Sequence, residues 1–240
     1  MVNIKMFIPR ESTALSLGAN DVARSVSDYS TLHEAQLNLI RNGSRGMFWL
    51  EPMLEVETSK GRFAYGPVDV SDVPSIMEDI TTNLLSKHTQ EHRLALGLTE
   101  ELTYLKKQTR LTFARAGITD PLSLNDYLAL DGFSGLHKAL AASSQEIVTT
   151  VVDSGLRGRG GAAFPTGIKW QTVHDAPSDK KYIVCNADEG DSGTFADRLV
   201  MECDPFMLIE GMIIAGLAVG ADEGYIYLRS LRLYTADAAA

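Results

Sequence analysis

The chain has 240 residues, of which 45% are hydrophobic and 22% charged, and its formal net charge is −9. These values are typical of a soluble globular protein with one large or two smaller domains. The acidic balance argues against general nucleic-acid binding, and two cysteines, Cys185 and Cys203, are too few for a disulfide framework. We therefore expect a cytoplasmic protein without a signal peptide or a membrane span.

Residues 1–84 are expected to form one small α/β domain. The residue pattern predicts strands at 4–8, 37–40, 48–50, 53–58 and 62–65, with a hairpin turn at Lys60-Gly61. It predicts helices at 16–34 and 73–84, the second with Asp72 as a candidate N-cap and Pro74 near its start.

Residues 85–140 read as a linker followed by short helices. The segment 85–110 is polar and ends on a basic patch at 106–110, while 121–127 and 135–141 are expected to be short helices.

Residues 141–230 are predicted to form the first part of a second α/β domain. A helix is expected at 144–152 with Ser144 as its N-cap, a buried strand at 182–185, a helix from Asp204-Pro205 to Gly220, and a strand at 225–228. This β–α–β order implies a right-handed crossover and a parallel sheet, and such sheets bind cofactors beyond the carboxyl ends of their strands.

A glycine-rich run lies between the first of these helices and the first strand. Gly158-x-Gly160-x-x-Ala163 matches the alanine variant of the dinucleotide fingerprint, which is a weak signal alone. In the fingerprint a helix follows, but residues 164–167, Phe-Pro-Thr-Gly, do not favour a helix. The run therefore predicts a glycine-rich nucleotide loop that is not an ordinary Rossmann turn.

The alternative for this run is a surface loop that needs glycine for its turns. Arg157, Arg159, Phe164, Lys169 and Trp170 are threaded through it, and they provide cations for phosphates and aromatic faces for rings. These side chains favour the nucleotide site over the plain loop.

A second polar run, 186–191, directly follows the predicted strand at 182–185. Its Asn and Asp side chains suit hydroxyl groups or the polar edge of a flavin ring, whereas its carboxylates would repel phosphates. A metal site is the rival interpretation, but the spacing fits no twelve-residue calcium loop. Cys185, Cys203 and His174 come without CxxC pairs, so we expect no zinc or iron–sulfur site in this chain.

The segments 154–170, 184–191 and 204–205 together resemble the FMN-binding flavoprotein subunit of respiratory complex I and its soluble relatives. The segments 41–52 and 109–115 look like the beta subunit of soluble NAD-dependent formate dehydrogenases. The diaphorase subunit of NAD-reducing hydrogenases is the close alternative.

This resemblance implies a thioredoxin-like domain at 1–84 and part of an FMN-binding, Rossmann-like domain at 141–230. Because residues 1–184 contain no cysteine, the first domain is expected to lack an iron–sulfur cluster and to act in docking. The resemblance further implies three sets of cofactor-binding residues. The FMN phosphate and ring would contact Gly158, Arg159, Gly160 and Lys169, and the polar edge of the flavin would contact Asn186 and Asp188, beside Glu189. NAD(H) would contact Gly161, Phe164 and Asp191.

The implied function is that of a diaphorase subunit, which passes electrons between NAD(H) and iron–sulfur centres through FMN. Its partners would be other subunits of a formate dehydrogenase or hydrogenase, including an iron–sulfur subunit. The family usually carries Glu at Asp191 and Phe at Thr172, which leaves the nucleotide contacts open. Residues 231–240 depart from the family, whose second half holds the [4Fe–4S] ligands, so a truncated, non-catalytic docking fragment is the alternative.

Overall fold

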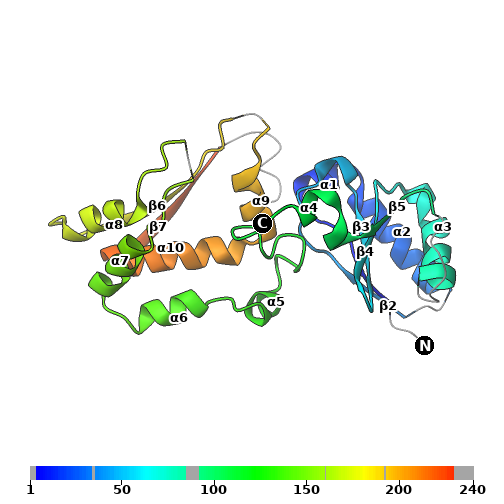
Figure 1. Ribbon diagram of the computed structural model, residues 1–240, viewed down its shortest axis with the longest axis horizontal. Helices are drawn as coiled ribbons and strands as arrows, with labels where there is room; N and C mark the ends of the chain where they lie inside the picture. The colour runs from blue at the N-terminus through cyan, green and yellow to red at the C-terminus, as the bar shows by residue number, and fades with distance from the viewer. Residues whose placement is uncertain (1–3, 34–35, 85–91, 160, 192, 230–240) are drawn as a thin grey trace. The chain divides into compact units, whose positions relative to one another are not determined.

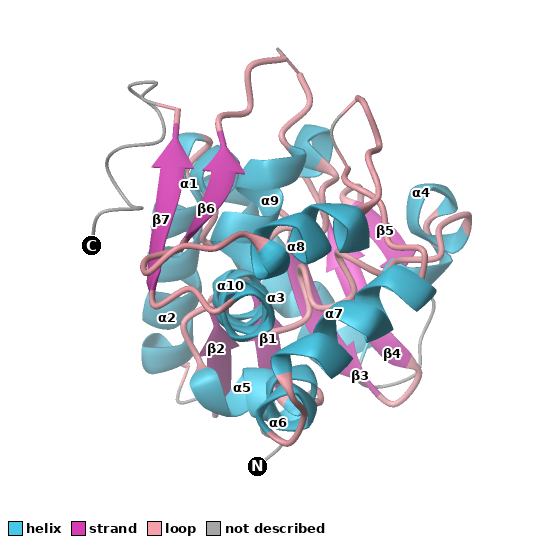
Figure 2. Ribbon diagram, turned by 90° about the vertical axis from the view of Figure 1, so that its left-hand side faces the viewer, coloured by secondary structure: helices cyan, strands magenta, loops and turns pink. Residues whose placement is uncertain are grey.

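The computed structural model describes residues 4–33, 36–84, 92–159, 161–191 and 193–229 (Figures 1 and 2). These residues divide into two compact units. With those gaps, unit 1 comprises residues 4–123 and 199–204, and unit 2 comprises 124–198 and 205–229. Among the described residues no helix has the length and apolar character that a membrane crossing requires.

Unit 1 is built on a five-stranded sheet with the order β2-β1-β3-β4-β5. Its elements in chain order are β1 (Ile4–Phe7), α1 (Ser12–Ser16), α2 (Ala19–Leu32), β2 (Leu37–Ile40), η1 (Phe48–Leu50), β3 (Leu54–Thr58), β4 (Gly61–Tyr65), η2 (Val70–Asp72), α3 (Val73–Asp79), η3 (Ile80–Leu84), β5 (Ala95–Leu98), η4 (Thr99–Glu101) and α4 (Thr103–Lys106). β1 pairs in parallel with β2, and β3 pairs antiparallel with both β1 and β4. This β–α–β unit followed by a β-hairpin and a helix is the thioredoxin-like arrangement that the sequence predicted.

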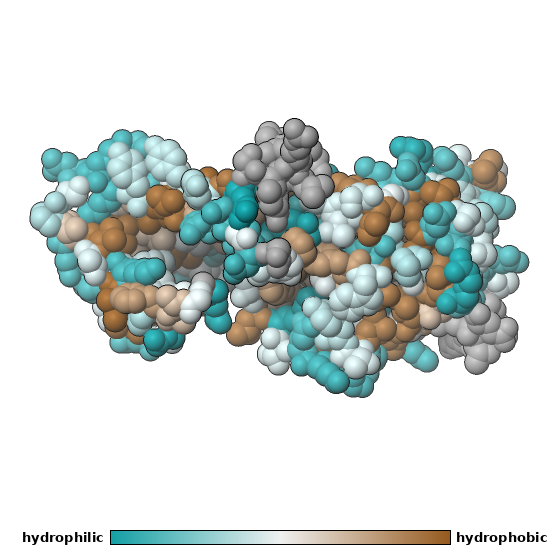
Figure 3. All heavy atoms as spheres, turned by 90° about the horizontal axis from the view of Figure 1, so that it is seen from above, coloured by the Kyte–Doolittle hydropathy of each residue, from teal (hydrophilic) through white to brown (hydrophobic). Residues whose placement is uncertain are grey.

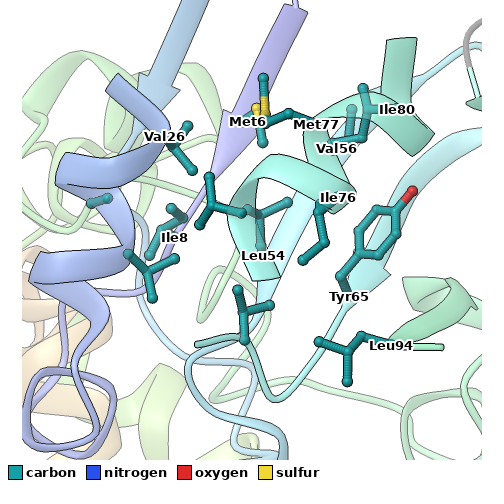
Figure 4. Close-up of a cluster of buried hydrophobic side chains, with 14 of the residues drawn as sticks. Met6, Ile8, Val26, Leu54, Val56, Tyr65, Ile76, Met77, Ile80 and Leu94 are labelled. Carbon is teal, nitrogen blue, oxygen red and sulfur yellow. The ribbon is translucent and has the colours of Figure 1, made fainter. Parts of the chain in front are cut away.

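The core of unit 1 lies between this sheet and the helices α2 and α3. Figure 4 shows side chains from β1, β3 and β4, among them Met6, Leu54 and Tyr65, meeting those of α2 and α3, such as Val26 and Ile76. All five are fully buried. Their burial is the main favourable contribution to the folding of this unit.

Three expectations for unit 1 were wrong in detail. Residues 48–50 form a 3-10 turn instead of a strand, closed by the Leu50 N–H on the Met47 carbonyl. The helix expected at 16–34 is the shorter α2, which begins only at Ala19 because the chain turns at Gly18, where φ is +98°; Ser16 ends the separate helix α1. The polar segment expected as a linker supplies an edge strand, β5, which pairs antiparallel with β4.

The segment 41–52 forms a network of buried polar contacts in unit 1. The buried Arg45 guanidinium lies 3.0 Å from the buried Glu55 carboxylate. The Ser44 hydroxyl donates to Glu51 at 2.7 Å, and the Ser44 N–H donates to the Cys203 thiol at 3.2 Å. Burial raises the pKa of Glu51 to about 8, and it also raises the pKa of Cys203. These polar groups are held by one another within the unit.

Unit 2 contains helices and a pair of parallel strands. Its elements are α5 (Leu124–Ala129), α6 (Ser134–Leu140), α7 (Ser144–Asp153), α8 (Thr166–Asp175), β6 (Tyr182–Ala187), the start of α9 (Ala196–Cys203), α10 (Pro205–Val219) and β7 (Glu223–Leu228). β6 and β7 pair in parallel from Tyr182 opposite Glu223 to Ala187 opposite Leu228, as the β–α–β pattern predicted. α10 packs with α6, α7 and α8 and covers one side of the strand pair.

The helix boundaries of unit 2 correct two predictions. Ser143, and not Ser144, is the N-cap of α7, where it forms a capping box with Glu146. A helix, α8, does follow the glycine-rich run, beginning directly after Pro165. It packs so closely on α7 that a Cβ on Gly167 would lie 2.6 Å from the Cα of Val152.

Candidate functional site

The glycine-rich run forms a short hairpin between α7 and α8. Its arms are joined by a bridge between Arg157 and Pro165, with hydrogen bonds from Gly158 N–H to the Phe164 carbonyl at 2.9 Å and from Thr166 N–H to the Leu156 carbonyl at 2.8 Å. The Arg157 Nε also donates to the Ala163 carbonyl at 2.8 Å. Arg157 therefore braces the hairpin, and the tip carries the remaining groups of the run.

The tip of the hairpin offers donors to a ligand. Among the described residues, the backbone N–H groups of Arg159, Gly161 and Ala162 donate to no other group. A Cβ on Gly161 would meet no atom within 4 Å, and one on Gly158 would make only ordinary contacts at 3.6 Å or more. Packing among the described residues thus does not explain these glycines, whereas close approach of a ligand to the backbone would.

Lys169 and Phe164 stand together beside the hairpin. Lys169 lies in the first turns of α8, and its Nζ is 5.6 Å from the centre of the Phe164 ring. Both side chains are exposed, so a cation and an aromatic face are presented together to solvent.

The end of β6 and the loop after it carry the second group of predicted residues. The strand runs to Ala187, two residues beyond the predicted end, so Asn186 lies within it and pairs with Tyr227. The Asn186 side chain accepts a hydrogen bond from the Asp188 N–H at 3.1 Å, which forms a tight turn at the end of the strand. Asn186, Asp188 and Asp191 are exposed. Their oxygens are therefore accessible to a ligand at the carboxyl end of the parallel pair.

Glu189 has a different environment from its neighbours in this loop. Its carboxylate accepts hydrogen bonds from the backbone N–H groups of Asp197 at 3.1 Å and Arg198 at 3.2 Å, at the start of α9. These are N–H groups that a helix leaves without partners in its first turn. Burial and the nearby Glu189 carboxylate raise the pKa of Asp197. Glu189 therefore connects the loop after β6 to the first turn of α9 by hydrogen bonds.

The hairpin and the loop after β6 lie at one end of unit 2. Figures 1 and 2 both show them extending from the end toward which β6 and β7 point. Of the predicted site residues, Gly160 lies outside the described residues, and so does the tail 231–240. A hollow of about 390 Å³ lies elsewhere, against α10 and the start of β7, and is lined by Ile183, Met212, Gly216 and Glu223 among others. It contains none of the predicted residues.

Two further features are relevant to metal and cofactor binding. The described residues hold no group of three or more His, Cys, Asp or Glu side chains arranged for a metal ion. Arg229, which our sequence interpretation gave no role, follows β7 directly and reaches the loop after β6 at Gly190. Its place immediately after a predicted strand makes it a general candidate, but no local pattern indicates that it reaches Gly190.

A glycine hairpin and a polar loop at the carboxyl end of parallel strands are an arrangement typical of nucleotide-binding α/β units. Comparison with known families identifies it further. Residues 151–239 match the family model described as the Nuo51 FMN-binding domain. This part of the chain is thus similar to the FMN-binding domain of that flavoprotein family.

Curated relatives agree with this assignment. The chain is 51% identical over 125 residues to the NADP-reducing hydrogenase subunit HndC of Solidesulfovibrio fructosivorans, a match that covers 52% of this chain and 25% of that protein. It is 50% identical over 113 residues to an NADH-quinone oxidoreductase subunit of Rhizobium meliloti, with 47% and 27% covered. The NAD-reducing hydrogenase HoxS subunit alpha of Cupriavidus necator is 46% identical over 102 residues, with 42% and 17% covered. The matched segment thus spans about a quarter or less of each relative.

Solved structures give weaker likenesses. An NAD+-reducing [NiFe]-hydrogenase in the air-oxidised state aligns over 97% of this chain and 38% of its own, with 22% identity and a TM-score of 0.42. The thioredoxin-like [2Fe–2S] ferredoxin of Aquifex aeolicus aligns over 40% of this chain and 99% of its own, with 15% identity and a TM-score of 0.34.

Proposed function

We propose that this chain is part of a diaphorase-type flavoprotein subunit, which passes electrons between NAD(H) and iron–sulfur centres through FMN. The observation that carries the proposal is that two features lie together at one end of unit 2. One is a glycine hairpin with N–H groups that donate to no other described residue, and the other is a polar loop after a parallel strand. Both lie within the stretch that matches the FMN-binding domain. The cofactor would accept hydride from NADH and release electrons singly.

The chain's own residues would bind and orient the ring system. In this proposal the tip of the hairpin, with Arg159 and Lys169, holds the FMN phosphate and the near part of the ring. Asn186 and Asp188 supply acceptors and donors to the polar edge of the ring. Gly161, Phe164 and Asp191 face the nicotinamide nucleotide, with the Phe164 ring stacking on a base.

Glu189 has an indirect role in this proposal. Because its carboxylate is occupied by the N–H groups at the start of α9, it positions the loop that follows β6 and carries Asp188. No general base is needed, since hydride transfer is direct once the two rings are stacked.

For the complex we propose a cytoplasmic NAD-dependent formate dehydrogenase, with the chain as part of its beta subunit beside an iron–sulfur subunit. The segments 41–52 and 109–115 support this choice. An NAD-reducing hydrogenase is the alternative, supported by the similarity to HndC and HoxS subunit alpha. In either complex the [4Fe–4S] ligands would come from sequence outside these 240 residues.

The test uses the full 240-residue chain. Purified protein incubated with FMN and freed of excess flavin should retain flavin absorbance and reduce ferricyanide with NADH. A Lys169→Gln variant should lose most of the bound flavin, whereas Lys60→Gln, in the exposed turn between β3 and β4, should not. A chain that retains no flavin would refute FMN binding by this chain. A tagged chain recovered with its partners should reduce NAD+ with formate, and reduction with hydrogen instead would favour the hydrogenase.

A second candidate, a non-catalytic docking fragment, is supported by one surface. Tyr182, Val184, Tyr225 and Tyr227 lie on the side of β6 and β7 opposite α10 and are 47 to 62% exposed. Figure 3 shows hydrophobic side chains, in brown, among hydrophilic ones on unit 2, the left-hand part of the view. Aromatic faces of this kind mark interaction surfaces. A colourless protein that still binds a partner subunit would support this candidate.

A further inference from the structure

Arg229 occupies a defined place at the carboxyl end of the strand pair. Ala187 of β6 pairs with Leu228 of β7, so Asp188 and Arg229 are the residues that leave the two strands at the same level. The guanidinium of Arg229 fills the space beside Gly190, because a Cβ on Gly190 would lie 2.9 Å from its Nη1. The arginine thus reaches the loop that follows β6 and carries Asp188.

The charge of Arg229 has no partner in the described part of the chain. The side chain is half-buried, yet it forms no ion pair and no hydrogen bond with any described residue. Exposed cations commonly lack partners, whereas a partly desolvated guanidinium is more favourable beside an anion or an electron-rich acceptor. Such a group is therefore a candidate for contact with a ligand.

We propose that Arg229 binds the electron-rich pyrimidine edge of the flavin and stabilises its reduced form. This inference rests on the proposed function. Hydride transfer from NADH delivers two electrons and one proton and leaves NAD+. The reduced ring therefore carries one more negative charge than the oxidised ring until it takes up a further proton.

The acidic loop explains why a cation is needed at this place. Asp188, Glu189 and Asp191 put three carboxylates in the loop that would lie beside the ring, and their charges would oppose a gain of negative charge there. They also disfavour a phosphate, whose donors are at the hairpin. The guanidinium beside Gly190 offsets the charge of these carboxylates where the ring gains negative charge. A charge near the flavin nitrogens is one way in which proteins set the reduction potential of this cofactor.

The experiment measures the reduction potential of FMN bound to the full chain by spectroelectrochemistry, together with the affinities for oxidised FMN and for riboflavin. Arg229→Gln should lower the potential by about 30 mV, which corresponds to about tenfold weaker binding of the reduced flavin relative to the oxidised flavin. Gly190→Ala, which displaces the guanidinium without removing it, should lower the potential in the same direction by less. Arg24→Gln, at an exposed arginine of α2, is the matched control and should leave the potential unchanged.

Each outcome decides the inference. The proposal is wrong if Arg229→Gln and Gly190→Ala both fold, as judged by circular dichroism, and bind FMN with an unchanged reduction potential. If only Gly190→Ala folds, an unchanged reduction potential of its bound FMN refutes the proposal and a lowered one supports it. If Arg229→Gln weakens oxidised and reduced FMN equally and leaves riboflavin binding unchanged, the guanidinium binds the phosphate, and the proposal is again overturned. Failure of the unsubstituted chain to bind flavin refutes the proposed function itself, a result distinct from either of these.

Discussion

Replacing Glu210 tests how the helices of unit 2 are held together. Glu210 is the acidic residue within the apolar helix α10, and its carboxylate accepts the Tyr127 hydroxyl and the N–H groups of Phe133 and Leu136, the latter two at 2.9 Å. Phe133 is the N-cap position of α6 and provides no side-chain cap of its own. Glu210 therefore supplies the acceptor that the first turn of α6 lacks.

The magnitude follows from these three bonds. A hydrogen bond to a charged group contributes about 1.5–3 kcal/mol, and a donor left without a partner in a partly buried place adds a further cost. The contributions are not additive, so we expect Glu210→Ala to lower the free energy of unfolding of unit 2 by about 3–5 kcal/mol. Glu210→Gln keeps one acceptor oxygen and should lower it by about 1–3 kcal/mol.

The assay is urea unfolding followed by the fluorescence of Trp170, which packs against the core of unit 2. A Trp49→Phe background removes the other tryptophan, an exposed residue of unit 1. Glu223→Gln, which breaks a surface ion pair with Lys180, is the control and should change stability by less than about 1 kcal/mol. The reasoning is refuted if Glu210→Ala lies within about 0.5 kcal/mol of the parent, the range of a surface substitution.

Three further results are expected. Burial raises the pKa of Glu51 from 4.5 to about 8, so its contribution to the stability of unit 1 is fully present below pH 4.5 and is lost as the pH rises through about 8. Glu51→Gln should abolish this loss of up to about 5 kcal/mol, and an unchanged pH profile of urea unfolding would contradict it. Gly167→Ala should destabilise unit 2 by about 2–3 kcal/mol, because its Cβ would meet the backbone of α7. Gly211→Ala, with open space around it, should stabilise the unit by about 0.5–1 kcal/mol. If urea unfolding found Gly167→Ala to be the more stable variant, the packing argument would be wrong. Iodoacetamide should modify half-buried Cys185 at least about tenfold faster than buried Cys203 in the native chain, and equal rates by mass spectrometry would show that Cys203 is accessible.

The elements that the sequence predicted well are those with a strong local signal. Residues 37–40 became β2 with the same bounds, and the parallel pairing of the last two strands followed from the helix between them. Asp204-Pro205 marked the start of α10, because proline is favoured in the first turn of a helix. Each of these signals lies within a few residues of the element that it defines.

The elements that the sequence missed depend on contacts between distant segments. β5 has the sequence Ala-Leu-Gly-Leu, with no β-branched residue, and it is a strand because β4 offers it a free edge. α8 begins after Pro165 despite a glycine in its first turn, because that glycine allows close packing on α7.

The site shows the same division. Asn186 and Asp188 were recognisable because they lie at the carboxyl end of a strand, although β6 extends to Ala187 and so includes Asn186. The role of Glu189 in holding the start of α9, and the approach of Arg229 to Gly190, are contacts between segments that no local pattern indicates.

The strand pair of unit 2 has a consequence for handling the protein. In the part of the chain that the structure describes, β6 and β7 pair only with each other, so the outer side of each strand presents N–H and C=O groups that can template the addition of another strand. Concentrated preparations of the isolated chain would therefore tend to self-associate through these edges. Co-expression with a polypeptide that occupies them would suppress aggregation.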